Sequence, residues 1–338
     1  MRGHLPPRPR GAIFRRRRST AILTRTDPVP RLPAQDPIAA LLAAPDGAAL
    51  AVIAGVEGPS YRPVGAMMTV LSEAERAGTL SSGCIESDIA LHAMRVAGSG
   101  RPETIRYGRG SPFVDIQLPC GGGLDVLLLP RPDREALSRV AANRAARLPC
   151  TLEIDAESGA MQVVEAGETG RDGPLLRIRF EPEIRFLVFG KGPEASTFAA
   201  LVQSAGYPNQ LLSPDDETLE AGAAAGCDTR SLSMPGFPSD LAADHRTAVV
   251  LFFHDHDWEP PILAGALETR AFYIGAQGSQ RARDARLLML EGMGVGEAQR
   301  ARLHGPVGLI PSARDAGTLA VSVLAEVLAE AMPPARPA

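Results

Sequence analysis

The sequence predicts an α/β protein with an N-terminal α+β domain and a C-terminal doubly wound parallel sheet. Two observations support this fold class. The chain has 338 residues, more than the roughly 250 at which a single core stops growing, so two domains are expected. Strand patterns cluster in the first half, whereas strands alternate with helices from Arg185 onward, which is typical of a parallel sheet.

The composition is that of a globular protein with a basic N-terminal arm. Hydrophobic residues make up 45% of the chain and charged residues 22%, which is sufficient for buried cores. Residues 1–34 contain nine arginines and one acid, Asp27, which leaves 26 basic and 38 acidic side chains elsewhere, a net charge of −12. This acidic body argues against nucleic-acid binding. We expect a disordered Arg/Pro-rich arm over 1–36, an α+β domain with a linker region over 37–182, and a Rossmann-like domain over 183–332.

The cysteines and the apolar segments indicate a cytoplasmic protein. Cys84, Cys120, Cys150 and Cys227 are far apart and form no C-x-x-C pair, as expected for a reducing compartment. No stretch approaches the ~20 apolar residues that span a membrane, so no membrane segment is expected. The arm lacks the apolar segment of a signal peptide, while a transit peptide or a different start codon stays open.

Short apolar runs separated by turns predict the elements of the first domain. Glu86 and Asp88 fall in the first turn of one predicted helix, where the helix dipole favours acids. The middle of the chain carries no recognisable chemistry and is expected to complete this domain. The expected helices cover 37–44, 85–96 and 134–146, and the expected strands cover 49–56, 66–71, 104–107, 113–118, 124–129, 151–155, 161–164 and 175–180.

The second domain is predicted from strands that alternate with helices. The run Ala248 to Phe253 is fully apolar, which is typical of a central strand in a parallel sheet. The expected strands cover 185–189, 210–212, 248–253 and 271–274, and the expected helices cover 193–204, 261–267, 281–291 and 318–331.

A glycine loop follows the first of these strands. Gly190, Gly192 and Ala195 form a G-x-G-x-x-A pattern, in which backbone N–H groups and a helix N-terminus approach a phosphate. Lys191, the one lysine of the chain, is a candidate phosphate partner, and Asp215 lies where a ribose-binding acid is expected. Glu194 in the next helix turn opposes an anion there, so nucleotide binding stays open.

Two more loops follow strands of the predicted sheet, where ligands of such folds bind. His254-Asp255-His256-Asp257 follows the central strand, either as a solvated loop that caps the next helix or as metal ligands. Gly275 to Ser279 follows the next strand, with Gly278 in the turn and Ser279 as a candidate N-cap.

Two glycine-flanked cysteines are the strongest chemical signal of the first domain. Cys84 lies at a predicted helix N-terminus, where the dipole lowers the pKa of a thiol and favours it as a soft ligand. Cys120 precedes Gly121, Gly122 and Gly123, a backbone run that can surround an anion with N–H groups. Together they indicate an anionic ligand that needs soft coordination.

In combination, these motifs resemble the XdhC/CoxI family over roughly residues 38–331. The segments that carry the resemblance are Gly58-Pro59-Ser60-Tyr61-Arg62-Pro63-Val64-Gly65-Ala66-Met67, Ser82-Gly83-Cys84-Ile85-Glu86, Cys120-Gly121-Gly122-Gly123-Leu124-Asp125-Val126, His254-Asp255-His256-Asp257, Ala271 to Arg281, and His304-Gly305-Pro306-Val307-Gly308-Leu309 with 320–326. The chain departs from the family at Ser213-Pro214-Asp215, where the family has Asp-Pro-Arg, and this weakens the nucleotide interpretation.

The resemblance implies an accessory protein rather than a catalyst. Proteins of this family bind the molybdenum cofactor (molybdopterin) as cargo, present it to a cysteine desulfurase for sulfuration, and insert it into the large subunit of a xanthine dehydrogenase-type enzyme. The implied molybdenum contacts are Cys84 and Cys120, the implied cofactor site adds Glu86, and the loop from Gly190 is a second anion site. NAD(P) is not expected as a cofactor, and nucleic acid and membranes are not expected as partners. A homodimer stays open.

The sequence leaves two alternatives, an NAD(P)-dependent oxidoreductase and an interaction protein with a vestigial Rossmann domain. The first lacks a Tyr-x-x-x-Lys pair because Lys191 is the single lysine. The preferred hypothesis also expects that the thiol-bearing loops of the first domain and the crevice of the second face one shared cleft.

Overall fold

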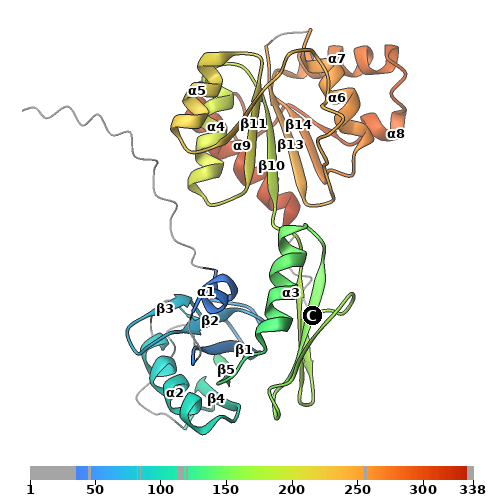
Figure 1. Ribbon diagram of the computed structural model, residues 1–338. Coiled ribbons are helices and arrows are strands. Elements are labelled where there is room, and N and C mark those ends of the chain that lie inside the picture. Colours follow the sequence, from blue (N-terminus) through green and yellow to red (C-terminus); the bar gives the residue numbers. More distant parts are fainter. Residues whose placement is uncertain are drawn as a thin grey trace, which may run out of the picture.

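The computed structural model of the protein describes residues 36–44, 47–81, 83, 85–112, 118, 121–254 and 257–332. It contains a five-stranded sheet, a four-stranded sheet and a six-stranded sheet. The elements from α1 to β9 form what we term the N-terminal unit, and those from β10 to α9 form the C-terminal unit (Figure 1).

The first sheet has the order β3-β2-β1-β5-β4, and all neighbours in it are antiparallel. Helix α2 packs on one face of the sheet, while α1 and α3 cover the other face. Because both faces are covered, β1 is buried along most of its length. The elements are α1 (Pro37–Ala43), β1 (Ala49–Glu57), β2 (Met67–Val70), β3 (Arg76–Gly78), α2 (Glu86–Ser99), β4 (Glu103–Gly108), β5 (Gly123–Leu129) and α3 (Arg134–Ala145).

The second sheet shares a core with the first. Leu152 and Leu176 of this sheet belong to the same buried cluster as Leu127 of β5 and Leu137 of α3. The middle of the chain therefore packs against the first sheet, as expected. The strands, all antiparallel in the order β7-β6-β9-β8, are β6 (Cys150–Asp155), β7 (Met161–Val164), β8 (Gly170–Asp172) and β9 (Leu175–Phe180).

The third sheet is parallel, with the order β12-β11-β10-β13-β14-β15. Successive residues of β10 point to opposite faces: Phe186 packs with α4 and α9, and Leu187 packs with α6 and α7. The elements are β10 (Arg185–Gly190), α4 (Pro193–Ser204), β11 (Asn209–Ser213), α5 (Asp216–Ala224), β12 (Asp228–Ser231), β13 (Thr247–Phe252), α6 (Glu259–Glu268), β14 (Tyr273–Ala276), α7 (Gln280–Gly292), α8 (Glu297–Arg300), β15 (Leu303–His304) and α9 (Ala316–Ala331).

This architecture confirms the predicted fold class, an α+β unit followed by a Rossmann-like parallel sheet. The sequence missed α5, α8 and the short strands β3, β8, β12 and β15. The strand predicted over 113–118 lies almost wholly outside the described residues. Among the residues that are described, no helix is long and apolar enough to cross a membrane.

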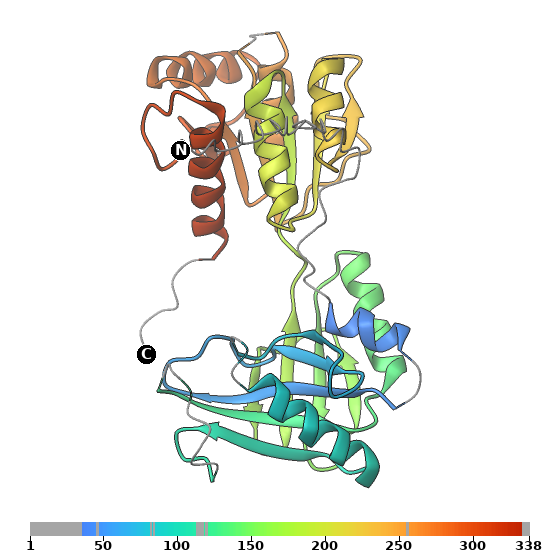
Figure 2. The same ribbon diagram turned by 90° about the vertical axis from the view of Figure 1, so that its left-hand side faces the viewer.

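The N-terminal unit contacts the parallel sheet at the edge where its strands begin. Arg147, just after α3, donates from Nε to Asp244 at 2.7 Å, and Asp244 lies three residues before β13. A cavity at the same junction is lined by α3 residues together with Arg185 and Pro208, which lie at the start of β10 and immediately before β11. The loops after the carboxyl ends of the strands lie at the opposite edge (Figures 1 and 2).

Candidate functional site

Three loops of the N-terminal unit leave the first sheet at the same end. The register pairs Glu57, the last residue of β1, with Gly123, which also faces Gly108 at the end of β4. Met68 of β2 faces Gly78, the last residue of β3. The loops over 58–66, 79–85 and 109–122 therefore leave the sheet at the same end, and they contain the sequence neighbours of both predicted thiol ligands.

The two cysteines themselves, Cys84 and Cys120, lie outside the described residues. Of their neighbours, Gly83 has a φ of +97° and Gly121 a φ of +71°, so both glycines adopt left-handed conformations that other residues rarely take. The predicted molybdenum contacts stay a prediction.

Glu86 holds the loop before α2 in place. Its side chain is nearly buried, and its carboxylate accepts hydrogen bonds from the Thr79 hydroxyl at 2.7 Å and from the Ser81 N–H and hydroxyl, each at 2.7 Å. The N–H of Ile85 adds a bond of 3.2 Å. Burial opposes ionisation, but these hydrogen bonds outweigh it and lower the pKa of Glu86 to about 2. Glu86 is an ionised anchor for the loop that precedes it, and its predicted contact with the cofactor stays a prediction.

The glycines after Cys120 allow a close passage of main chains. A Cβ on Gly122 would lie 2.0 Å from the Pro59 carbonyl oxygen, and a Cβ on Gly123 would lie 2.9 Å from the Arg109 carbonyl oxygen. The Gly122 carbonyl accepts the Arg109 N–H at 3.0 Å. These glycines join the loops over 58–66 and 109–122, and their role as an anion cradle remains untested.

Charged side chains flank the same end of the sheet. Arg106 donates to the Asp125 carboxylate at 3.1 Å, to the Arg109 carbonyl at 2.8 Å and to Glu57. The hydrogen bond and charge of Asp125, with those of Glu57, raise the pKa of Arg106. The cluster ties β1, β4 and β5 together where the loops begin.

The glycine loop of the C-terminal unit lies between β10 and α4. A Cβ on Gly190 would come within 2.7 Å of the Phe252 carbonyl oxygen, so glycine permits close packing of β10 against β13. The Lys191 N–H donates to that carbonyl at 3.2 Å, and the Gly192 N–H donates to Thr218 Oγ1 at 2.8 Å. Two N–H groups that a phosphate cradle would offer are therefore already satisfied.

The first turn of α4 is also poorly suited to an anion. Pro193 has no N–H, and Glu194 adds a negative charge in this turn. Ala195 is buried in the core of the unit. Nucleotide binding at this loop stays a prediction, and the local chemistry gives it little support.

Thr218 connects the glycine loop to Asp215. The Thr218 hydroxyl donates to the Asp215 carboxylate, which also accepts the Thr218 N–H at 3.0 Å as the N-cap of α5. These hydrogen bonds, with a smaller contribution from the charge of Lys191, hold the pKa of Asp215 below its ordinary value. Asp215 caps a helix, and its contact with a ribose remains a prediction.

At the carboxyl edge of the sheet, His254 and Gln277 link two loops, with their Nε2 atoms 3.1 Å apart. The Gln277 carbonyl accepts from Arg286 Nη2 at 2.8 Å, and Arg286 pairs with Glu259 through an Nη2–Oε2 contact of 3.0 Å. Arg286 is 3% exposed and Glu259 is 5% exposed. A buried ion pair therefore fixes the loop after β14.

The other predicted residues of this edge have local roles. A Cβ on Gly275 would lie 2.7 Å from a methyl carbon of Val307, so this glycine is required for packing. Gly278 has a φ of +141°, and Ser279 is the N-cap of α7, where it accepts the Ala282 N–H at 3.2 Å. Asp255 lies outside the described residues. The N-cap prediction is confirmed, and ligand contacts at this edge are untested.

No group of three or more His, Cys, Asp or Glu side chains that could hold a metal occurs in the described part of the chain. Cys150 and Cys227 are free and buried. Burial raises the pKa of Cys227 to about 11, so its thiol stays protonated at neutral pH.

The structure corrects one expectation. The thiol-bearing loops and the carboxyl-edge crevice do not face a shared cleft within one chain, because the N-terminal unit contacts the opposite edge of the parallel sheet. A strand of six residues such as β13 separates the two edges by roughly 20 Å. The sequence motifs give no signal for the edge at which the units meet.

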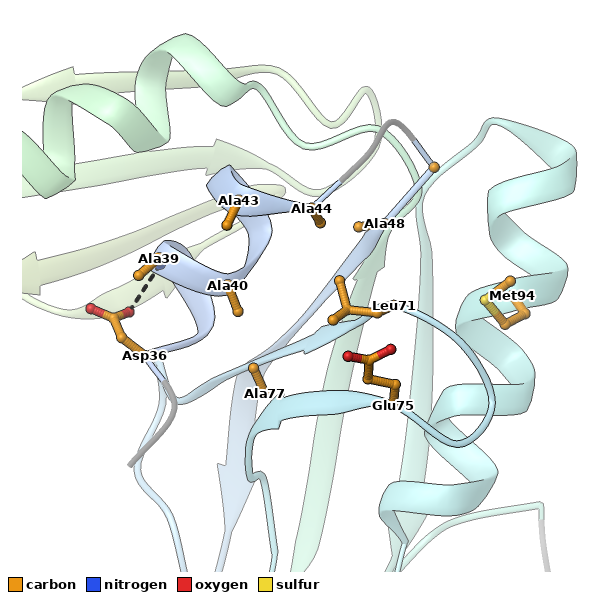
Figure 3. A pocket seen from close by; sticks show the side chains of 11 residues that line it. Asp36, Ala39, Ala40, Ala43, Ala44, Ala48, Leu71, Glu75, Ala77 and Met94 are labelled. Carbon is orange, nitrogen blue, oxygen red and sulfur yellow. Dashed lines mark hydrogen bonds between the residues drawn. The ribbon is translucent and has the colours of Figure 1, made fainter. Parts of the chain in front are cut away.

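A cavity of about 780 Å³ lies between α1 and the hairpin of β2 and β3. Alanines of α1 line it, and Figure 3 shows Leu71 and Glu75 pointing toward them. None of the predicted site residues lines this cavity.

Comparison with known proteins decides the family. Residues 41–108 match the XdhC and CoxI family, and residues 186–327 match the XdhC Rossmann domain. Over 282 residues, the chain is 35% identical to a protein of Escherichia coli (strain K12) named molybdenum cofactor insertion chaperone PaoD, covering 83% of this chain and 82% of the relative. The chain belongs to the XdhC and CoxI family. The name of this relative agrees with the prediction of an accessory protein rather than a catalyst.

Two further proteins are similar to this member of the XdhC and CoxI family over most of its length. A Bacillus subtilis (strain 168) protein named a probable xanthine dehydrogenase subunit is 25% identical over 323 residues, covering 86% of this chain and 94% of the relative. A Bacillus halodurans protein, described with its crystal structure as a xanthine dehydrogenase, has a TM-score of 0.71 at 21% identity and covers 87% of this chain and 94% of its own. The latter likeness establishes the fold.

Sequence reasoning missed several residues that organise the predicted sites. Thr218, Arg286 and Glu259 act through contacts between positions far apart in sequence, which no short motif reveals.

Proposed function

We propose that this protein binds the molybdenum cofactor as cargo and inserts it into a xanthine dehydrogenase-type enzyme. The cofactor binds at the end of the first sheet where the loops that contain Cys84 and Cys120 leave it. The protein also presents the bound cofactor to a cysteine desulfurase for sulfuration, and the large subunit of the client enzyme is its acceptor.

The observation that carries the proposal is that the strand register brings these loops out at the same end of the sheet. Glu57, Gly108 and Gly123 lie side by side at this end, and so does Gly78, the last residue of β3, which faces Met68. A pterin dithiolene with a molybdenum centre needs soft ligands and shielding from water, and a thiol just before a helix N-terminus, as at Cys84, is such a ligand. The relative named a molybdenum cofactor insertion chaperone is 35% identical to this chain over 282 residues, 83% of its length.

Glu86 positions residues of the loop that leads into helix α2. Its ionised carboxylate accepts short hydrogen bonds from Thr79 and Ser81 and so holds these two residues in place. A preorganised loop binds its ligand at a lower entropic cost than a mobile one. The role of Glu86 is to position the loop rather than to act on the cofactor.

Cofactor binding is tested with the purified full-length protein. Released molybdopterin is expected to raise the melting temperature and to co-elute with the protein in gel filtration, whereas NAD is expected to do neither. At a free concentration of 100 times the Kd, the stabilisation is about 2.7 kcal/mol. Stabilisation by NAD and not by molybdopterin would contradict the proposal and favour an oxidoreductase.

Single substitutions locate the site. Cys84→Ala and Cys120→Ala are each expected to reduce cofactor retention without unfolding the chain. Cys227→Ala is the matched control, because the Cys227 thiol is buried in the core of the C-terminal unit. Equal retention by wild-type protein and by both loop variants would refute the assignment.

A further inference from the structure

A second cavity, of about 710 Å³, lies beside the loop end of the first sheet. Its wall includes Gly65 to Met67 at the start of β2 and Gly78 to Thr79 at the end of β3. Because Thr79 also donates to Glu86, this cavity adjoins the loop whose geometry Glu86 fixes. Its volume is within the range of small-molecule pockets.

Four arginines line this cavity, and they divide into two kinds. Arg144 pairs with Asp36 at 2.6 Å and with Glu183 at 3.0 Å, and Arg179 pairs with Glu181 at 2.8 Å.

Arg62 and Arg76 differ from Arg144 and Arg179 in their contacts. Within the described part of the chain neither forms an ion pair, and Arg76 donates to the neutral hydroxyl of Ser87 at 3.1 Å. Two positive charges from different segments, the loop over 58–66 and strand β3, thus have no carboxylate within ion-pair distance among the described residues. In a chain with an acidic body, positive charges without a carboxylate partner favour the approach of an anion.

The remaining wall indicates what else the ligand carries. Phe180 is partly exposed and provides an aromatic surface, whereas Ile38 and Met67 are almost fully buried. Thr79 and the paired carboxylates of Glu181 and Glu183 provide hydrogen-bonding groups. An aromatic side chain beside polar groups suits a flat heterocycle, and guanidinium groups suit a phosphate because they donate two parallel hydrogen bonds.

We propose that this cavity binds a phosphorylated heterocycle and that Arg62 and Arg76 hold its phosphate group. The anion site of the protein then lies in the N-terminal unit, not at the glycine loop after β10, where two N–H groups are already bonded. The identification of the ligand as the phosphate-bearing cofactor rests on the proposed function, whereas phosphate binding by the two arginines does not.

The first test measures binding of inorganic pyrophosphate to the full-length protein by calorimetry. The wild type is expected to bind, and the double variant Arg62→Gln/Arg76→Gln is expected to bind at least about tenfold more weakly, since hydrogen bonds to charged groups are lost. Arg101→Gln is the control, because Arg101 is exposed in the loop between α2 and β4 at the other end of the sheet, and it is expected to bind within about twofold of the wild type. Equal binding by the double variant, or no binding by the wild type, overturns the proposal.

A folding control and a second ligand complete the test. Arg76→Lys keeps the charge on β3 and is expected to lose less affinity than Arg76→Gln, with unchanged thermal unfolding in the absence of ligand. With molybdopterin, the wild type is expected to prefer the phosphorylated form over the phosphatase-treated form, and the double variant is expected to lose this preference. A wild type that binds pyrophosphate but neither form of molybdopterin leaves the phosphate site standing and refutes the proposed function; a preference retained by the double variant refutes the phosphate site alone.

Discussion

Two buried glutamates at the predicted binding ends of the two units are stabilised in different ways. Glu86 is the first residue of α2 and is 7% exposed, and Glu259 is the first residue of α6 and is 5% exposed. Glu86 accepts hydrogen bonds from neutral donors of its own loop. Glu259 instead pairs with Arg286, which comes from the next helix of the fold.

The difference indicates which unit has a loop whose order depends on the charge of one side chain. The order of the loop before α2 depends on the charge of Glu86, because the same residues that satisfy the carboxylate form the loop. At the carboxyl edge of the parallel sheet, Arg286 pairs with Glu259 and also holds the Gln277 carbonyl, while its buried Nη1 has no hydrogen-bond partner among the described residues. The first arrangement suits a site that receives cargo, and the second suits a scaffold.

The largest effect is expected from breaking the buried pair in the scaffold. Arg286→Met leaves the Glu259 carboxylate buried without its partner, which costs about 3–5 kcal/mol. Trp258, the one tryptophan of the chain, stacks on Phe253 beside this pair with ring centroids 6.4 Å apart. Its fluorescence during urea denaturation therefore reports the unfolding of the C-terminal unit.

The control for this prediction removes both charges. Glu259→Met/Arg286→Met is expected to be more stable than Arg286→Met, because no unpaired charge stays buried. If the single and double variants unfold at the same urea concentration, the ion pair does not stabilise the scaffold in the way described.

A smaller, pH-dependent effect is expected at Glu86. The pKa of this carboxyl is about 2 in the folded protein against an ordinary 4.5, so its contribution to stability is complete above pH 4.5 and is lost as the pH falls toward 2. The shift corresponds to roughly 3 kcal/mol. Glu86→Gln is expected to lower the free energy of unfolding at pH 7 by about 2–3 kcal/mol and to remove this acid-dependent part.

The measurement is denaturant unfolding followed by circular dichroism between pH 7 and pH 3, with hydrogen exchange at Leu80 and Ser81 as the local probe. Glu135→Gln is the matched control, since Glu135 lies in the first turn of α3 and is exposed. A pH profile of Glu86→Gln that parallels the wild type would show that the loop does not depend on this charge.

The glycine loop after β10 provides a third, smaller contrast. Thr218→Val removes the acceptor of the Gly192 N–H and a donor to Asp215, which is expected to cost about 1–2 kcal/mol. Thr218→Ser keeps the hydroxyl and is expected to recover most of this loss in thermal unfolding. A Val variant as stable as the wild type would mean that the Thr218 hydroxyl does not satisfy the Gly192 N–H, which would then be free for a ligand. The proposed difference between the two units in anion binding would weaken.

The fold class was accessible from the sequence because both patterns on which it depends are local. The alternation of strands and helices from Arg185 onward and the fully apolar strand near Val250 define a parallel sheet wherever they occur. Elements such as β12 and β15 were missed because they are short edge strands: β12 is polar, Asp228–Ser231, and β15 has two residues. Pairing with a neighbouring strand, rather than their own composition, makes them strands.

The site was accessible only in part. The first-turn position of Glu86 was predicted from the helix dipole, but its hydrogen bonds back to the loop depend on a turn that the sequence does not specify. The contact of Arg147 with Asp244 joins residues 97 positions apart. No motif therefore predicted that the units meet at the edge where the strands of the parallel sheet begin. The cavity with Arg62 and Arg76 was likewise invisible, because it forms between several separate segments.

The smallest effect is expected at Lys191. It tests most directly whether the anion site lies in the N-terminal unit rather than at the glycine loop after β10. The pKa of Asp215 is lowered first by hydrogen bonds from Thr218 and only last by the charge of Lys191, and the Lys191 side chain is exposed. Lys191→Gln is therefore expected to change the free energy of unfolding by less than about 0.5 kcal/mol. It is also expected to leave pyrophosphate affinity unchanged, because Lys191 lies at the edge of the sheet away from the N-terminal unit. Calorimetric thermal unfolding checks the stability, and calorimetric titration with pyrophosphate checks the affinity, each against the wild type. A severalfold loss of affinity would move the anion site back to the glycine loop.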